Sequence, residues 1–339
     1  MPAFEIDPDI KKASTLPSGF YTDSKYFHLS KEKIFERCWH FIGCKNERKA
    51  LCPLVILPGF LDEPVVLSTS AEGIHCLSNV CTHRGKILID EPCDAELIRC
   101  GYHGRRFSLT GKFLSMPEFD EVESFPTSAD DLYRYAVADT AGFLFISGDP
   151  IAPFGEFVCG TGESLFAING NDLCLTETRE YDVAAHWALY CENYLEGFHI
   201  PFVHKALNQR VDYGTYTTTT YRYSSLQTGY GKNGEVAGQY LFIFPNIMLN
   251  FYPWGVSINI VEPITPSRSR IRYLTYVADE SKLNIGAGTD LDRVEMEDEA
   301  VVESVQRGIR SRFYDRGRYS PTREQGTHHF HRLIAEFME

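Results

Sequence analysis

The chain has 339 residues, of which 43% are hydrophobic and 23% charged, as expected of a folded protein long enough for two domains. Its formal net charge of -13 argues against a general affinity for nucleic acid, because phosphate binding needs a basic surface. No stretch approaches the ~20 apolar residues of a membrane helix, and the first residues lack the pattern of a signal peptide. We therefore expect the ten cysteines to be mostly reduced thiols in a cytoplasmic setting.

The first half of the chain predicts an N-terminal arm followed by a small all-β domain. We expect residues 1–38 to form the arm, with a short helix near Lys31–Cys38, and to belong with the C-terminal half. Residues 39–150 contain short apolar runs separated by Gly and Pro, such as Val65–Leu67 and Phe143–Ile146, which is typical of strands. The Gly and Pro residues at 148–155 predict a domain boundary there.

Residues 151–339 predict a second domain of mixed type. Ala185–Leu207 has helical apolar spacing with a break, and Leu291–Arg312 predicts a long helix. Between them lie apolar runs that predict strands of an antiparallel sheet: Tyr216–Tyr223, Gln239–Phe244, Ile247–Phe251, Val256–Val261 and Ile271–Val277. The expected fold class is therefore α+β, with helices on one side of the sheet.

The first motif combines thiols and imidazoles on two loops. Cys81 and His83 form a Cys-x-His pair, and Cys100 and His103 form a Cys-x-x-His pair. In a Rieske [2Fe–2S] centre the two Cys hold one iron and the two His hold the other. A structural zinc site is the alternative, although zinc fingers usually place both Cys on one loop and both His on another. The mixed loops favour the Rieske cluster.

The second motif contains two histidines and a carboxylate in a helical segment. Glu196 and His199 are three residues apart and share a helix face, whereas His204 lies about 140° round a regular helix from His199. Pro201 supplies a break that lets the two histidines converge. Two His and one carboxylate form a facial triad that holds a mononuclear iron and leaves coordination positions open for oxygen.

We expect Asp298 to supply the carboxylate of this triad. It lies within the apolar stripe of the long helix, where a carboxylate is costly unless it is paired or metal-bound. Glu297 lies about 100° away on the edge of the stripe and is predicted to be solvated, although the choice between the two carboxylates stays open. Glu196 is better placed to bridge the two iron centres by hydrogen bonds to their histidines, across the subunits of a head-to-tail ring.

These motifs resemble those of the α subunits of Rieske non-heme iron oxygenases. Cys191–Leu207, Met296–Gly308 and Tyr314–His331 look like the choline monooxygenase branch of that family. The resemblance implies a Rieske domain inserted in a helix-grip catalytic domain, commonly a homotrimer, and electrons from NAD(P)H through a separate reductase or ferredoxin. On this pattern His199, His204 and Asp298 match the iron ligands, and Glu196 matches the bridging carboxylate.

The expected function is therefore an oxygenase that uses O₂ to hydroxylate or demethylate a small organic molecule, such as a choline- or betaine-like quaternary amine. The alternatives are a ring hydroxylase or O-demethylase for an aromatic acid, and a Rieske electron carrier without oxygenase activity. A G-x-G-x-x-G pattern at Gly229–Gly234 lacks the strand, helix and acidic residue of a nucleotide site, which agrees with a separate reductase. It predicts a hairpin or lid instead.

For two further groups of residues, the sequence favours a structural role. Phe242, Phe244, Phe251, Tyr252 and Trp254 suit a cation–π pocket, but ordinary strand core is the favoured interpretation. His328, His329 and His331 alternate at strand spacing, which favours a structural role over a further metal site.

Overall fold

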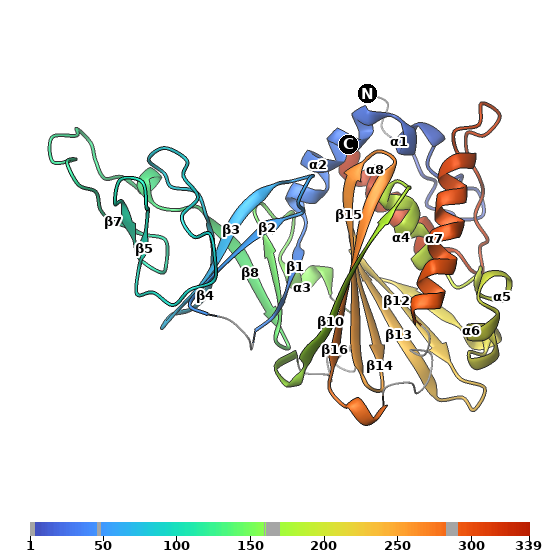
Figure 1. Cartoon of the computed structure of the whole chain (residues 1–339). Helices are drawn as coiled ribbons and strands as arrows, with labels where there is room; N and C mark the ends of the chain where they lie inside the picture. The colour runs from blue at the N-terminus through green and yellow to red at the C-terminus, as the bar shows by residue number, and fades with distance from the viewer. Residues whose placement is uncertain (1–3, 46–48, 159, 161–169, 283–290) are drawn as a thin grey trace. The chain divides into compact units, whose positions relative to one another are not determined.

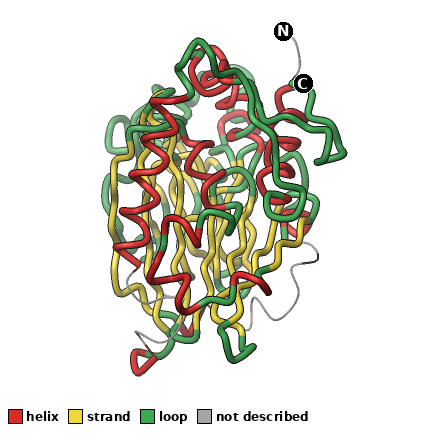
Figure 2. The backbone as a smooth tube through the Cα atoms, turned by 90° about the vertical axis from the view of Figure 1, so that its right-hand side faces the viewer, coloured by secondary structure: helices red, strands yellow, loops and turns green. Residues whose placement is uncertain are grey.

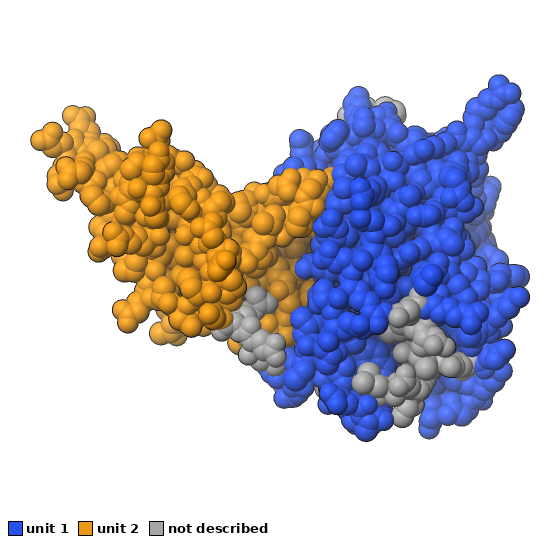
Figure 3. Space-filling view, viewed as in Figure 1, with its two compact units in different colours: residues 1–38, 152–339 blue, residues 39–151 orange. Residues whose placement is uncertain are grey.

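The computed structural model describes residues 4–45, 49–158, 160, 170–282 and 291–339. The chain divides into two compact units (Figure 3). The large unit combines Met1–Cys38 with Ala152–Glu339, and the inserted unit is Trp39–Ile151. The large unit is therefore discontinuous in sequence.

The described residues of the inserted unit form β-strands and one short 3₁₀ helix, η2 (Ser128–Asp130). Its six-stranded antiparallel sheet has the order β1-β9-β8-β4-β3-β2, and β5, β6 and β7 form a second, three-stranded sheet. The strands are β1 (His40–Cys44), β2 (Leu51–Ile56), β3 (Glu63–Ser70), β4 (Gly73–Ser78), β5 (Ile98–Arg99), β6 (Arg106–Phe107), β7 (Phe113–Ser115), β8 (Arg134–Thr140) and β9 (Phe143–Ser147).

A seven-stranded antiparallel sheet forms the centre of the large unit. Its order is β10-β16-β15-β14-β13-β12-β11, so that the strands after β10 follow one another as a meander. The strands are β10 (Cys174–Val183), β11 (Thr217–Thr220), β12 (Ser224–Tyr230), β13 (Val236–Ile243), β14 (Ile247–Tyr252), β15 (Gly255–Thr265) and β16 (Arg268–Val277). The central strands are almost completely buried, which explains their long apolar runs.

Helices lie across one face of this sheet (Figures 1 and 2). The α-helices are α1 (Ser18–Thr22), α2 (Ser24–Lys33), α3 (Phe154–Phe157), α4 (Trp187–Tyr194), α5 (Ile200–Val203), α6 (Lys205–Arg210), α7 (Leu291–Gly308) and α8 (Gln325–Met338). Single 3₁₀ turns occur at η1 (Phe35–Arg37), η4 (Gly170–Asp172), η5 (Tyr213–Thr215) and η6 (Glu280–Lys282). Among the described residues, no helix combines the length and the apolar character needed to cross a membrane.

Aromatic side chains join α8 to the sheet and to α4. Phe330 contacts Phe242 and Phe244 edge-on, with ring centroids 5.5 and 5.9 Å apart, and Trp187 at 5.8 Å. Each such pair adds about 0.5–1.5 kcal/mol to the effect of burial. The strand-core interpretation is therefore correct for Phe242 and Phe244. This packing fixes α4, the helix that precedes the second motif.

The predicted α+β class is confirmed, and several local predictions are wrong. The helix near Lys31–Cys38 is instead the end of α2 followed by the 3₁₀ turn η1. The segment Tyr216–Tyr223 is not one strand, because a turn separates β11 from β12. His328, His329 and His331 lie in helix α8, so their strand-like alternation is coincidental. The Gly229–Gly234 segment closes the β12–β13 hairpin.

Candidate active site with two iron centres

Two similar turns of the inserted unit carry the first motif. In each turn, the amide of Cys81 or Cys100 donates a hydrogen bond to the carbonyl five residues later. The amide of Gly85 or Gly104 donates back to the cysteine carbonyl, at 3.0 and 3.1 Å. Both glycines have φ near +75°, at 72° and 77°, a conformation that other residues adopt only at a cost. The repeated turn explains why each Cys is followed four residues later by a glycine.

The turns bring the four predicted cluster residues together. The rings of His83 and His103 lie edge to face with centroids 4.8 Å apart, and the thiols of Cys81 and Cys100 are close enough for each to shift the pKa of the other. Nδ1 of His103 is buried, and no described group hydrogen-bonds to it. A buried ring nitrogen without a partner is what a metal ligand leaves when the metal is absent. Two thiols and two imidazoles fit a Rieske cluster.

A buried arginine supports the second turn. The side chain of Arg105 is 2% exposed, and its guanidinium donates to Asp130 Oδ1 at 2.7 Å. The guanidinium also lies over the rings of Phe107, Phe113 and Phe125, 4.8–5.7 Å from their centroids. Arg105 was not predicted from the sequence as a residue of the site. It follows His103 by two residues, but Phe113, Phe125 and Asp130, with which it interacts, lie in other segments of the chain.

The second motif lies where the helical segment of the large unit is broken. Helix α4 ends at Tyr194, α5 begins at Ile200 with Pro201 in its first turn, and α6 follows His204. His204 has φ -101° and ψ 75°, outside the helical region, so the chain bends at this residue. Two breaks, rather than the expected one at Pro201, turn His199 and His204 toward each other.

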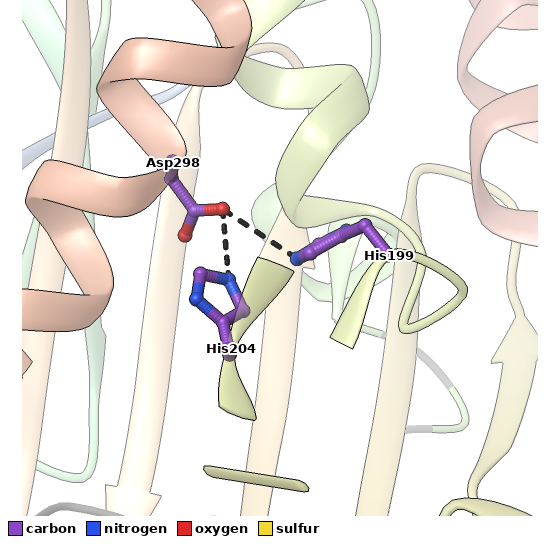
Figure 4. Close-up of side chains that lie close together, drawn as sticks. All are labelled: His199, His204 and Asp298. Atoms are coloured by element: carbon purple, nitrogen blue, oxygen red, sulfur yellow. Dashed lines mark hydrogen bonds and ion pairs between the residues drawn. The ribbon is translucent and has the colours of Figure 1, made fainter. Parts of the chain in front are cut away.

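The structure brings His199, His204 and Asp298 together (Figure 4). One ligand atom from each residue lies within 4.8 Å of the other two. Nε2 of His204 is 3.0 Å and Nε2 of His199 is 3.5 Å from Oδ1 of Asp298. Two imidazoles and a carboxylate that converge from α7 and from the α4–α6 segment have the donor set of a 2-His-1-carboxylate iron site. The three residues therefore fit a mononuclear iron.

Two further carboxylates hold the outer nitrogens of these histidines. Nδ1 of His199 lies 2.7 Å from Glu196 Oε1, and Nδ1 of His204 lies 2.8 Å from Glu297 Oε2. Carboxylates in this position orient a ligating imidazole and fix which nitrogen faces the metal. The prediction that Glu297 is merely solvated is wrong, because its carboxylate pairs with His204 and with Arg293. The angular positions of residues around the helix did not show that His204 would lie beside the edge of the apolar stripe, next to Glu297.

The electrostatics of His204 reflect this double pairing. Burial acts to lower the pKa of the imidazole, but the hydrogen bonds to Asp298 and Glu297 outweigh it and raise the pKa. The hydrogen bond from His204 in turn lowers the pKa of Glu297. Without a bound cation, the acidic groups of the site therefore favour a proton on this histidine.

A small cavity of about 110 Å³ opens beside the three residues. Its wall carries five tyrosines and several amide or hydroxyl groups. The tyrosines are Tyr190, Tyr194, Tyr216, Tyr240 and Tyr252. Of the dense aromatic group noted in the sequence, only Tyr252 lines the cavity, and Trp254 stacks on it with centroids 5.1 Å apart.

Polar residues on β15 point into this cavity. Ser257 and Asn259 line it, whereas the neighbouring Ile258 and Ile260 are buried on the other face of the sheet. Because successive side chains of a strand alternate between faces, the polar positions mark the side that meets the cavity. Asn250 on the adjacent strand β14 also lines it and hydrogen-bonds to Asn259 at 3.3 Å.

The three C-terminal histidines take no part in this cavity. His331 is fully buried and bonds to Tyr319 through Nδ1 at 2.6 Å and to Glu192 through Nε2 at 3.0 Å. His328 bonds to the carbonyl of Asp7 at 2.8 Å. These contacts fasten α8 to α4 and to the N-terminal arm, which agrees with the predicted structural role.

Comparisons with known proteins follow the two units. The family "Ring hydroxylating alpha subunit (catalytic domain)" matches residues 172–339, and the family "Rieske [2Fe-2S] domain" matches residues 59–126. Chloroplastic choline monooxygenase of Arabidopsis thaliana is 32% identical over 97% of this chain and 85% of its own length. The carnitine monooxygenase oxygenase subunit of Escherichia coli K12 is 29% identical, with 96% and 94% covered.

Solved structures show the same relationship. The quaternary ammonium Rieske monooxygenase CntA, in complex with L-carnitine, superposes with a TM-score of 0.79 at 26% identity and covers 99% of this chain and 100% of its own. Naphthalene 1,2-dioxygenase with indole bound gives a TM-score of 0.75 at 17% identity, over 96% and 92% of the two chains, and shares the fold.

The chain thus belongs to the Rieske non-heme iron oxygenases and is an α subunit of this family. The family carries a Rieske [2Fe–2S] cluster in one domain and a mononuclear iron in the other. The predicted family, the fold and the oxygenase class of enzyme are confirmed by these matches.

Proposed function

We propose that this chain is a monooxygenase that hydroxylates a small quaternary amine of the choline or betaine type. The observation that carries the proposal is the composition of the cavity beside His199, His204 and Asp298. Five tyrosines and three acidic residues line it, and none of its described lining residues is Lys or Arg. Aromatic rings and carboxylates are the groups that recognise a quaternary ammonium.

The relatives support the same substrate class. Choline monooxygenases and carnitine monooxygenase match this chain over nearly its full length, and CntA has been solved with L-carnitine and with γ-butyrobetaine. The described cavity wall carries no Lys or Arg, so the carboxylate of any substrate, aromatic or aliphatic, would lack a cationic partner there. The quaternary amine is favoured over an aromatic acid because the more similar relatives over nearly the whole chain are choline and carnitine monooxygenases.

The residues have distinct roles in this proposal. His199, His204 and Asp298 hold the mononuclear iron, and Cys81, His83, Cys100 and His103 hold the [2Fe–2S] cluster. When bound, the iron supplies oxygen activation and the cluster supplies single electrons. Both turns of the inserted unit hold their cysteines in place through backbone hydrogen bonds.

Glu196 and Glu297 act on the imidazoles rather than on the substrate. Each carboxylate accepts from the Nδ1–H of its histidine, which presents Nε2 toward Asp298. Glu196 also accepts from the backbone amide of His199 at 3.1 Å, so its position is fixed. We propose that Glu196 is in addition the bridge to a cluster histidine of a neighbouring subunit.

Electron delivery requires partners beyond this chain. We propose a homotrimer in which the cluster of one subunit serves the iron of the next, and a separate NAD(P)H-dependent reductase or ferredoxin that reduces the cluster. A structure of the relative CntA is described as giving insight into inter-subunit electron transfer. Thiolate cluster ligands suit a reducing compartment, which supports a cytoplasmic location.

The overall reaction inserts one oxygen atom into a C–H bond. O₂, two electrons and two protons yield the hydroxylated substrate and one water. Hydroxylation of a methyl group on the quaternary nitrogen gives a carbinolamine that loses formaldehyde, hence demethylation. Hydroxylation at the alcohol carbon of a choline-like molecule gives an aldehyde hydrate. The tyrosine-rich wall binds and orients the cation in either case.

A single-turnover experiment tests this function. Protein with cluster and iron restored is reduced chemically and mixed with ¹⁸O₂ and choline, glycine betaine, carnitine or an aromatic acid. We expect one labelled oxygen atom in the product of a quaternary amine, or an equivalent of formaldehyde, detected by mass spectrometry. Product from aromatic acids alone would overturn the substrate class and leave the oxygenase class intact.

A further inference from the structure

One carboxylate in the cavity wall is not used by the iron site. Glu295 lies on α7 one turn before Asp298 and lines the same cavity. Glu196, Glu297 and Asp298 each pair with a histidine. Among the residues that the structure describes, none forms a hydrogen bond or an ion pair with Glu295. This carboxylate is therefore available to a ligand.

The surroundings of Glu295 are aromatic rather than basic. The negative charge of Glu295 contributes to the raised pKa of three tyrosines: Tyr190 of α4, Tyr252 of β14 and Tyr273 of β16. Arg179 of β10 is also within electrostatic range, but its guanidinium pairs with Glu177 at 2.7 Å and does not line the cavity. Tyr190 and Tyr252 line the same cavity as Glu295, so the carboxylate shares its wall with aromatic side chains.

Burial makes this position costly for a free carboxylate. Desolvation raises the pKa of Glu295 to about 8; the positive charge of Arg179 opposes this effect, and the negative charges of Glu299 and Asp298 add to it. The ionised form of such a buried carboxyl group is stabilised most by a cation that carries no tightly bound water into the cavity. A quaternary ammonium is such a cation, because its methyl groups are weakly hydrated and its charge is permanent.

The position on the helix also suits the reaction. Residues three apart on a helix share a face and are separated by ~4.5 Å along the axis. In a choline-like molecule the carbons that can be oxidised lie one or two bonds from the nitrogen. A cation held at Glu295 therefore keeps these carbons within the space between Glu295 and the residues that hold the iron.

We propose that Glu295 is a specificity-determining residue that pairs with the cationic head of the substrate and selects cations without a carboxylate over zwitterions. The inference rests on the proposed function and deepens it. A zwitterion brings a carboxylate that meets Glu295 and Glu196 but no Lys or Arg among the described lining residues. The hydroxyl and amide groups of Ser257, Asn250 and Asn259 suit a neutral alcohol instead.

Binding to the oxygen-free holoenzyme, measured by calorimetry, tests this inference. The ligands are choline, its uncharged carbon isostere 3,3-dimethyl-1-butanol, and glycine betaine. We expect the wild-type protein to bind choline most tightly. In Glu295→Gln, choline affinity falls at least tenfold, isostere affinity is unchanged within twofold, and betaine affinity rises. Glu295→Asp retains the preference for choline over the isostere.

A matched control makes the same Glu-to-Gln change elsewhere on the helix. Glu303 lies two turns further along α7, outside the cavity, and its Oε1 accepts from the amide of Ala184 at 2.9 Å. Glu303→Gln keeps an acceptor at that place, so we expect the ligand preferences of the wild type. Iron content and thermal midpoint are recorded for every variant.

The outcomes separate this inference from the function on which it rests. If the wild type neither binds nor oxidises any quaternary amine, the proposed function fails and the inference fails with it. If the wild type oxidises choline but Glu295→Gln retains the preference for choline over its isostere, only the inference is overturned. The same holds if the variant loses choline and isostere equally, because Glu295 would then act on the shape of the cavity and not through its charge.

Discussion

Oε2 of Glu297 lies 2.8 Å from Nδ1 of His204, on the side of the ring opposite to Nε2. This carboxylate is one residue away from Asp298, yet the two face different nitrogens of one imidazole. Adjacent residues on a helix point about 100° apart. Because His204 lies at the edge of the apolar stripe of α7, Glu297 and Asp298 can reach its two ring nitrogens from different directions. Glu297 thereby fixes the ring of His204 against Asp298.

Replacing Glu297 should weaken iron binding without removing the site. We expect Glu297→Ala to lower iron affinity by about 10–100-fold, because the imidazole loses its orienting partner, whereas Glu297→Gln loses less because its amide oxygen can still accept. Iron content is measured after dialysis against a graded chelator. The Rieske absorption spectrum serves as the internal control and should not change. Equal iron retention in all three proteins contradicts the assigned role.

Replacing Glu196 should separate electron transfer from cofactor content. Glu196 holds Nδ1 of His199 and is the proposed bridge to a neighbouring cluster. We expect Glu196→Gln to keep both iron centres and to lose at least a hundredfold of the rate at which reduced cluster is reoxidised in the presence of substrate and O₂. Stopped-flow absorption of the cluster measures this rate. A variant with full iron content and wild-type reoxidation would show that Glu196 only orients His199.

The sequence indicated the candidate metal ligands more clearly than the residues that position them. Cys81, His83, Cys100 and His103 lie in two short local motifs, so spacing alone indicated that they act together. Asp298 was proposed as a ligand because a carboxylate in an apolar stripe is costly unless it is paired or metal-bound, and the structure places it beside both histidines. The roles of Glu297 and Arg105 were missed because they depend on His204 and on Phe113 and Phe125, which other segments supply. Contacts between distant segments leave no periodic signal.

In the fold as well, elements with a clear local sequence pattern were predicted and an element without one was missed. Strands β14 and β15 are buried in the centre of the sheet and carried clear apolar runs. Edge strand β10 was missed, because most of its residues are exposed and its central residues, Thr176–Glu180, are all polar or charged. Helix α7 was predicted four residues too long, since Gly308 ends it at a usual C-terminal residue.

Replacing Arg105 by lysine should destabilise the cluster even though the positive charge is kept. Its planar guanidinium packs against three phenylalanine rings and pairs with Asp130, and the ammonium of lysine cannot stack in this way. We expect Arg105→Lys to cost the inserted unit about 1–2 kcal/mol and to bleach the cluster faster on warming. Absorption of the cluster against time at a fixed temperature is the measurement.

Arg106 supplies the matched control for this prediction. It is the next residue in β6 and is exposed. Arg106→Lys makes the same chemical change and should leave the rate of bleaching unchanged. Mononuclear iron content should be unaffected in both variants. Identical bleaching of Arg105→Lys and the wild type would mean that the stacked guanidinium contributes nothing to the cluster turns.

Protonation of His186 should contribute to acid destabilisation of the large unit. The imidazole is fully buried among Phe20, Tyr21 and Phe27, and its Nδ1 accepts from the amide of Ala188 at the start of α4. Burial lowers its pKa from 6.5 to about 3. The unfolded chain then binds more protons than the folded one, so stability falls as the pH drops from about 6.5 toward 3. Each pH unit in that window costs up to about 1.4 kcal/mol.

The variant His186→Asn isolates this contribution. Asparagine can accept from the amide of Ala188 as an N-cap, but it does not titrate. The variant should be less stable than the wild type at pH 7.5 because it fills less of the aromatic pocket. Between pH 7.5 and 5.5 it should lose about 1 kcal/mol less than the wild type, since one unit of that interval lies below the unfolded pKa.

Urea midpoints of the wild type and His186→Asn at both pH values measure the difference. His329, another buried imidazole with a lowered pKa, is present in both proteins and cancels. Parallel losses in the two proteins would show that the folded protein accommodates a proton on His186 without cost.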